Sequence, residues 1–138
     1  MFAVSNFKNW FETLTPETLA ELSEYYRDDI YFKDPFNEFK GIGKLNLIFT
    51  HMFEKLKEPH FVFIDIVEGE DSAYLTWDFH FKINNKVYKI HGSSLIKWNN
   101  DGKVFYHRDY WDVGEEVLMK IPILKSFYQI LYNKLNIA

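Results

Sequence analysis

The pattern that decides the fold lies in residues 26–36, which read Tyr26-Arg27-Asp28-Asp29-Ile30-Tyr31-Phe32-Lys33-Asp34-Pro35-Phe36. An aromatic strand ends here at one carboxylate, Asp34, and Pro35 favours an extended backbone at that residue. The flanking aromatic side chains would exclude water and disfavour the charged carboxylate, which suits a general acid or base. The alternative is an Asx turn, in which Asp34 accepts hydrogen bonds from nearby backbone N–H groups.

Composition narrows the possible functions. A chain of 138 residues with 20% aromatic residues forms one domain and can line a cavity as well as pack a core. Its net charge of −4 argues against a general nucleic-acid surface, and the lack of cysteine excludes disulfides and cysteine nucleophiles. The first residues do not combine a basic region with an apolar run, so we expect no secretion signal and a cytoplasmic location.

The apolar residues change their spacing along the chain. Helical spacing predicts helices over residues 5–14, after Thr15-Pro16, and over 45–56. From His60 onward the spacing alternates, which predicts strands over residues 61–67, 73–83, 86–98 and 104–112. This order predicts an α+β fold with helices on one face of an antiparallel sheet. Residues 115–135 continue as an amphipathic helix with a break near Pro122.

With these elements in place, residues 26–36, the turn at 99–103 and the pair Tyr110-Trp111 resemble the nuclear transport factor 2-like superfamily. Within it, the chain is similar to ketosteroid isomerases and SnoaL-like polyketide cyclases over residues 7–112. The resemblance implies a single SnoaL-like domain over residues 1–138. Residues 1–113 would form a cone-shaped, cystatin-like curved antiparallel sheet wrapped on N-terminal helices, and 114–138 a helical extension. The superfamily contains several kinds of enzyme and plain binding modules, so the resemblance identifies a fold better than a reaction.

The resemblance also assigns roles to residues. Asp34 falls where the isomerase keeps its proton-abstracting carboxylate, whereas the two oxyanion donors fall on Trp10 and Ser94. The isomerase oxyanion hole is therefore absent, which argues against steroid isomerisation. The resemblance places Trp111 in the pocket, and alternation along the strand then adds Phe105, His107 and Asp109 to the same face. The other residues expected to line the pocket are Tyr26, Phe36, Phe49, Phe53, Trp77, Phe79 and Phe81.

Two hypotheses follow. In the first, the protein is an enzyme that binds a small apolar molecule without a cofactor and uses Asp34, with His107 and Asp109, for proton transfer. In the second, it is a non-catalytic binding module, and His107 and Asp109 are a buried polar pair. An open cavity that holds Asp34 would favour the enzyme, and a cavity filled by Phe36, Phe53 and Trp77 would favour the module. The five histidines lack the spacing of a metal site, so we predict none.

Two surfaces are expected to have partners. The sheet face opposite the pocket is predicted to join a homodimer through Tyr74, Asp78, His80, Tyr106, Arg108 and Tyr110. The apolar stripe of the last helix is predicted to be buried on the pocket mouth, the core or a second subunit, with an anionic membrane surface as the less favoured alternative. That stripe consists of Ile123, Leu124, Phe127, Ile130, Leu131 and Leu135.

Overall fold

The computed structural model describes residues 2–117 and 122–136 and confirms the predicted α+β order. Three helical segments precede the first strand, a longer helix lies between the second and third strands, and two helices follow the last strand. The elements are α1 (Val4–Glu12), η1 (Thr18–Glu21), α2 (Leu22–Tyr25), β1 (Tyr26–Lys33), β2 (Glu38–Lys40), α3 (Ile42–Lys55), β3 (Lys57–Glu68), β4 (Ser72–Ile83), β5 (Lys86–Trp98), β6 (Val104–Trp111), α4 (Val113–Glu116) and α5 (Pro122–Leu135).

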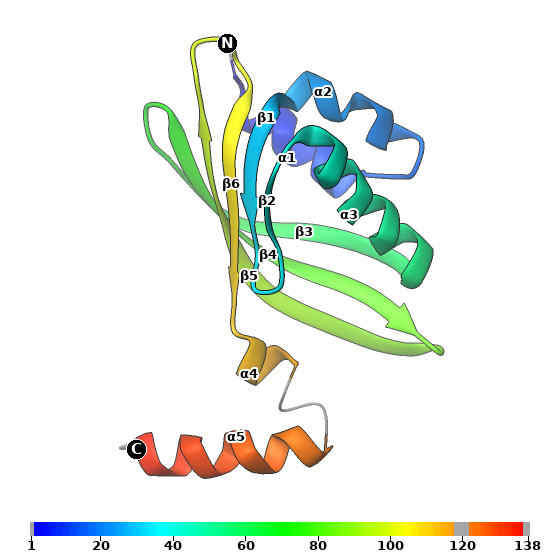
Figure 1. Cartoon of the computed structure of the whole chain (residues 1–138), viewed down its shortest axis with the longest axis vertical. Coiled ribbons are helices and arrows are strands. Elements are labelled where there is room, and N and C mark those ends of the chain that lie inside the picture. The colour runs from blue at the N-terminus through cyan, green and yellow to red at the C-terminus, as the bar shows by residue number, and fades with distance from the viewer. Residues whose placement is uncertain (1, 118–121, 137–138) are drawn as a thin grey trace.

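The six strands form one curved sheet in the order β2-β1-β6-β5-β4-β3. The predicted antiparallel meander is confirmed for β3 to β6, whereas β1 pairs with β6 in parallel and β2 is a three-residue strand at the edge. Figure 1 shows α1, α2 and α3 together on one side of the sheet, with α4 following the end of β6. The helices therefore cover one side of the curved sheet, and the far end of β6 leads into α4.

Aromatic side chains from the helices and from β1 form the core. Phe7 and Phe11 of α1, Phe49 of α3 and Tyr26 and Phe32 of β1 are all buried in one cluster. Each large apolar side chain buried in this way stabilises the fold by roughly 1.5–3 kcal/mol. The core thus holds α1 and α3 firmly against the sheet that carries the candidate site.

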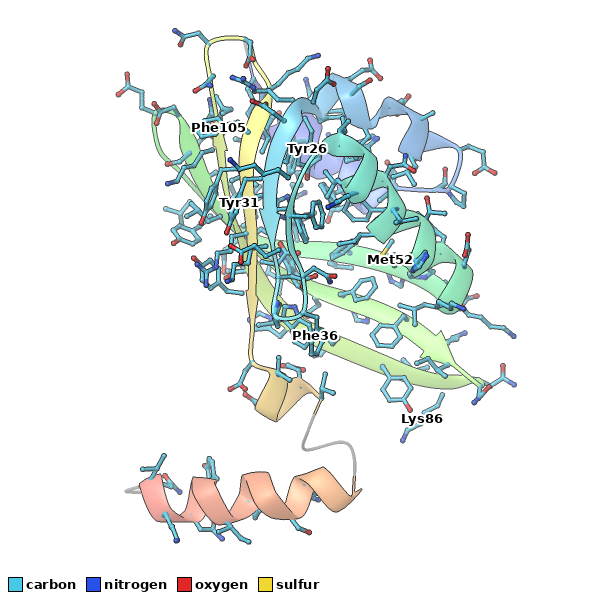
Figure 2. All side chains as sticks on the ribbon, viewed as in Figure 1. Tyr26, Tyr31, Phe36, Met52, Lys86 and Phe105 are labelled. Carbon is cyan, nitrogen blue, oxygen red and sulfur yellow. The ribbon has the colours of Figure 1, made fainter. Side chains whose placement is uncertain are left out.

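Alternation along β4 follows the prediction. Trp77 is buried toward the helices, whereas Asp78 bonds His91 and the His80 ring stacks on His60. Asp78 and His80 therefore lie on the outer face of the sheet. Figure 2 shows side chains projecting from both faces of the sheet.

The prediction for Phe105 is wrong. The β5–β6 register shifts between Lys97 and Trp98, so that Val104 pairs with Trp98. Val104 is fully buried in the core, and Phe105 is only half-buried and stands outside that cluster. An extra residue in one strand reverses the alternation on one side of it, which a strict two-residue period cannot anticipate.

The C-terminal region contains the predicted break, because α5 begins at Pro122, where a helix tolerates proline. Ile130 and Leu135 are 57% and 72% exposed within this single chain, so these two side chains are not buried against its own core or pocket mouth. Their burial against a second subunit stays a prediction. The side chains of Ile123, Leu124, Phe127 and Leu131 lie outside the described part. Among residues 2–117 and 122–136, no helix is long and apolar enough to cross a bilayer.

Candidate functional site

Asp34 forms the turn between β1 and β2. Its Oδ1 accepts hydrogen bonds from the backbone N–H of Phe36 at 2.8 Å and of Asn37 at 2.7 Å, and from the Asn37 side-chain amide at 3.1 Å. This is the Asx turn that the sequence offered as the alternative role. Asp34 does not share a cavity with Trp77, Phe79 and Phe81, because the turn carries it outside the cone.

We expect Asp34→Ala to lower the free energy of unfolding by about 1 kcal/mol, because two backbone N–H groups lose their acceptor. Asp34→Asn keeps an acceptor oxygen and should lose less. Urea unfolding of both variants measures the difference. Unchanged stability in the alanine variant would contradict the turn-forming role.

The interior of the cone is almost filled. It leaves a cavity of about 20 Å³, which is room for one water molecule. Tyr26, Phe53, Phe79 and Phe81 are not among its lining residues, although each was predicted to be. The cavity is lined by Phe7, Phe11, Phe49, Phe61, Phe63, Trp77, Ser94, His107 and Asp109.

A chain of hydrogen bonds crosses the sheet beside this cavity. The Tyr26 hydroxyl lies 2.8 Å from His107 Nδ1, and His107 Nε2 lies 2.7 Å from Asp109 Oδ1. The Ser94 hydroxyl donates to the same Oδ1 at 2.5 Å and accepts from the Trp77 indole N–H at 2.8 Å. His107 and Asp109 are two residues apart on β6, and Ser94 pairs with Asp109 across the sheet, so strand register alone brings these three side chains together.

The hydrogen-bond partners of His107 favour one arrangement of the protons. An ionised Asp109 can only accept hydrogen bonds, so a neutral His107 beside it carries its proton on Nε2 and accepts the Tyr26 O–H at Nδ1. Burial, and then the nearby Asp109 charge, raises the pKa of Tyr26 well above its usual value. Tyr26 therefore stays protonated as a donor and holds His107 in this tautomer.

Asp109 keeps one carboxylate oxygen available. Both hydrogen bonds end on Oδ1, and among the described residues no buried side-chain nitrogen or oxygen lacks a partner. Oδ2 accepts no bond from those residues and is therefore accessible to solvent. The Asp109 side chain is 19% exposed and lines both the inner cavity and a second, larger space.

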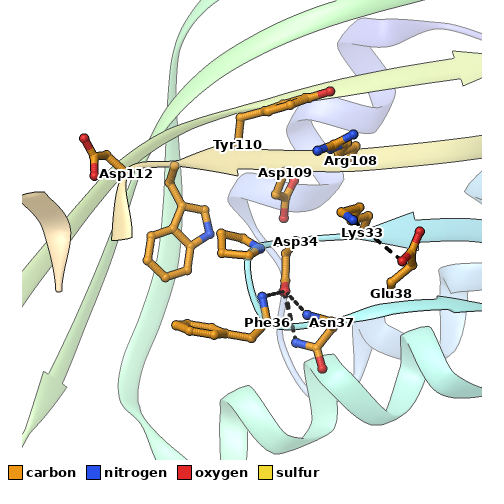
Figure 3. A pocket seen from close by; sticks show the side chains of 11 residues that line it. Lys33, Asp34, Phe36, Asn37, Glu38, Arg108, Asp109, Tyr110 and Asp112 are labelled. Carbon is orange, nitrogen blue, oxygen red and sulfur yellow. Dashed lines mark hydrogen bonds and ion pairs between the residues drawn. The ribbon is translucent and has the colours of Figure 1, made fainter. Parts of the chain in front are cut away.

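That second space, which we call the mouth groove, is an open hollow at the surface with a volume of about 620 Å³, lined by residues 33–38 and 108–112. Its size is typical of small-molecule sites. Phe36 is 69% exposed and its ring meets Trp111 edge-on at 5.5 Å, which gives the groove an aromatic wall. Figure 3 shows the Asp109 carboxylate directed toward the turn that carries Asp34, Phe36 and Asn37.

The two predicted oxyanion donors are both occupied. The Trp10 indole N–H donates to the backbone carbonyl of Thr18 at 3.2 Å, and the Ser94 hydroxyl donates to Asp109. Trp10 lines neither the inner cavity nor the mouth groove. Neither predicted donor is therefore free to bind an oxyanion, and Asp109 is held by two hydrogen-bond donors, Ser94 and His107.

The groove is also lined by seven residues that the sequence did not assign to the site, namely Lys33, Pro35, Asn37, Glu38, Arg108, Tyr110 and Asp112. Arg108 and Tyr110 were expected on the outer face of the sheet. All except Glu38 are neighbours in the chain of a predicted site residue, and that adjacency was the only signal for them. Among the described residues, no group of three or more histidine, cysteine, aspartate or glutamate side chains is arranged to hold a metal ion.

Comparisons with known proteins agree with this architecture. A family model described as a SnoaL-like domain matches residues 7–107. An NTF2-like protein of unknown function from Burkholderia pseudomallei K96243 is 11% identical with a TM-score of 0.72, over 86% of this chain and 95% of that chain. An NTF2-like protein of unknown function from Exiguobacterium sp. 255-15 is 19% identical with a TM-score of 0.68, over 79% and 97%.

A further solved structure, an LEH-like epoxide hydrolase from M. tuberculosis, is 13% identical with a TM-score of 0.69 and covers 93% of this chain and 88% of that chain. No curated protein matches the chain. At these identities the solved structures establish the fold alone. The family match covers most of the chain, and the chain belongs to the SnoaL-like domain family.

Proposed function

We propose that this protein binds a small, largely apolar molecule in the mouth groove and that Asp109 acts on it as a general acid or base. The observation that carries the proposal is the chain from Tyr26 through His107 to Asp109, whose last member borders the groove with a free carboxylate oxygen. In this proposal Asp34 shapes the groove by forming the turn that presents Phe36.

The geometry supports proton transfer at one atom. Asp109 Oδ1 is held by the Ser94 hydroxyl and the His107 N–H, which fix the carboxylate and leave Oδ2 to take a proton from a ligand or from a water molecule. His107 is 3% exposed, so its hydrogen bonds are not exchanged for bonds to water. The proposed reaction is a proton abstraction or a water activation in which Asp109 takes the proton. The negative charge that develops on the substrate oxygen would be met by the cationic side chains that line the groove, Lys33 and Arg108, or by solvent. The epoxide hydrolase among the structural relatives supports an enzyme reading.

The alternative function is a binding module without catalysis. The nearly filled inner cavity favours it, as does the complete hydrogen bonding of buried side-chain groups in the described residues. Two assays decide between the proposals. Hydrogen–deuterium exchange at the α-carbon of cyclohexanone reports proton abstraction, and opening of styrene oxide reports water activation. Activity in either assay supports the enzyme, whereas ligand binding without activity in both favours the module.

We expect Phe36→Ala to weaken binding of the neutral fluorophore N-phenyl-1-naphthylamine about tenfold, equivalent to about 1.4 kcal/mol, because a groove wall is lost. Val87→Ala is the matched control, because Val87 is similarly exposed at 65% but lies on the β4–β5 hairpin, away from the groove. Fluorescence titration measures both. Equal effects of the two substitutions would contradict binding in the mouth groove.

We also propose a homodimer through the outer face of the sheet. On this face Tyr31 stacks on Tyr106 at 5.2 Å and Lys97 lies over Tyr106, whereas Arg108 and Tyr110 also line the mouth groove. Aromatic and cationic side chains of this kind are common at interfaces. Tyr74 is exposed on the same face, and we expect Tyr74→Glu to convert a dimer to a monomer in light scattering. A monomeric unmodified protein would contradict the proposal.

A further inference from the structure

Trp77 lies directly over Gly92 on the neighbouring strand. The two residues are paired across β4 and β5, and the indole crosses the backbone of β5 at that point. A Cβ atom at position 92 would fall 2.6 Å from Cη2 and 2.9 Å from Cζ2 of the indole, too close for any side chain. Glycine in a strand interior often marks such a close approach. The lack of a side chain at Gly92 therefore leaves the space that the indole ring occupies.

Two further contacts fix the indole in this place. Its N–H donates to Ser94 Oγ at 2.8 Å, and Phe61 meets the ring edge-on at 5.4 Å. Trp77 is buried, so the ring occupies the interior of the cone and does not cover its surface. Three contacts therefore hold the Trp77 side chain in one position: the close approach to the Gly92 backbone, the hydrogen bond to Ser94 and the ring contact with Phe61.

The space next to this ring has the character of a binding site. Five phenylalanines form most of its wall, and Ser94, His107 and Asp109 supply its polar groups. Only about 20 Å³ of it is free. Apolar cavities of about 150 Å³ stay dry and bind benzene-sized molecules. The indole of Trp77 thus fills volume that, if empty, would hold an aromatic ring beside Asp109.

We propose that Trp77, packed against the Gly92 backbone, determines the size specificity of this site. Its indole keeps every part of a ligand larger than a water molecule out of the inner cavity. The natural ligand then remains in the mouth groove and reaches Asp109 from that side. This proposal rests on the proposed function only in placing the natural ligand in the groove. Trp77 and Gly92 act by position and volume and need not touch the ligand.

The test uses the whole chain and indole as the added molecule. With the mouth groove first saturated by N-phenyl-1-naphthylamine, Trp77→Ala should bind indole, measured by calorimetry and by the rise in thermal midpoint, whereas the unmodified protein under the same conditions should show neither. At a free indole concentration ten times Kd, the unfolding constant of the variant should fall about 11-fold. Trp111→Ala is the matched control, because it also removes an indole, but from the mouth groove, and it should gain no such binding.

A second variant covers the case in which Trp77→Ala does not fold alone. Its refolding yield is then compared with and without indole, and Trp77→Leu, which removes less volume, is titrated with benzene. Recovery of folding by indole, or benzene binding by the leucine variant, supports the proposal. Absence of binding in both variants, or an equal gain in Trp111→Ala, overturns it. Fluorophore binding to the groove of the unmodified protein is measured separately, so either proposal can fail without the other.

Discussion

Replacing Asp109 by asparagine is expected to lower turnover by about 10²–10⁴-fold while the chain remains folded. Asparagine has nearly the same shape and can still accept a hydrogen bond from His107 or Ser94, but its amide cannot take up the proton. The rate of α-hydrogen exchange or of epoxide opening, whichever the unmodified protein catalyses, measures the loss. Urea unfolding of the same sample shows that the fold is retained.

Asp65→Asn is the control for this experiment, because Asp65 is an exposed carboxylate on β3, outside both the groove and the inner cavity. It should leave turnover unchanged. Full activity of Asp109→Asn would exclude Asp109 as the proton acceptor. An equal loss in Asp65→Asn would point to a general effect of charge.

Tyr26→Phe should lower the free energy of unfolding at neutral pH by roughly 1–3 kcal/mol, because Nδ1 of the buried His107 loses its donor. The variant should also lose less stability at alkaline pH than the unmodified protein does. Burial and Asp109 raise the pKa of folded Tyr26 above the unfolded value of about 10, so its contribution is complete below about pH 10 and is lost as pH rises through the folded pKa. Urea unfolding from neutral pH to about pH 11 measures both effects.

Tyr31→Phe is the matched control, since the Tyr31 hydroxyl bonds Glu38 on the surface. It should have a smaller effect at neutral pH. All other tyrosines are the same in Tyr26→Phe and in the unmodified protein. The difference in pH-dependent stability between these two proteins therefore comes from Tyr26 alone. An alkaline slope that is the same with and without the Tyr26 hydroxyl would contradict a buried, protonated donor.

Alternation predicted one part of the site well. Because side chains two residues apart on a strand share a face, the sequence placed His107 beside Asp109, and the structure brings them within 2.7 Å. Their shared partner Ser94 was identified by the family resemblance, but as an oxyanion donor. Its actual contact depends on the β5–β6 register, which the sequence alone does not specify.

The role of Asp34 shows why local sequence was insufficient. An Asp-Pro-Phe segment after an aromatic strand is compatible with a pocket carboxylate and with an Asx turn. The β1–β2 hairpin decides between them, because Lys33 pairs with Glu38 and forces a tight turn at Asp34. That hairpin depends on β2, a strand of three residues with no alternation long enough to detect. The inner cavity was misjudged for a similar reason, since the contact of Trp77 with Gly92 joins two strands.

The most direct test of binding in the mouth groove is a crystal structure of the protein with a bound small molecule selected by native mass spectrometry. We expect the ligand to lie in the mouth groove against Phe36 and Trp111, with a polar atom within hydrogen-bond distance of Asp109 Oδ2. A ligand bound inside the cone of the unmodified protein, or one bound in the groove without contact to Asp109, would contradict it.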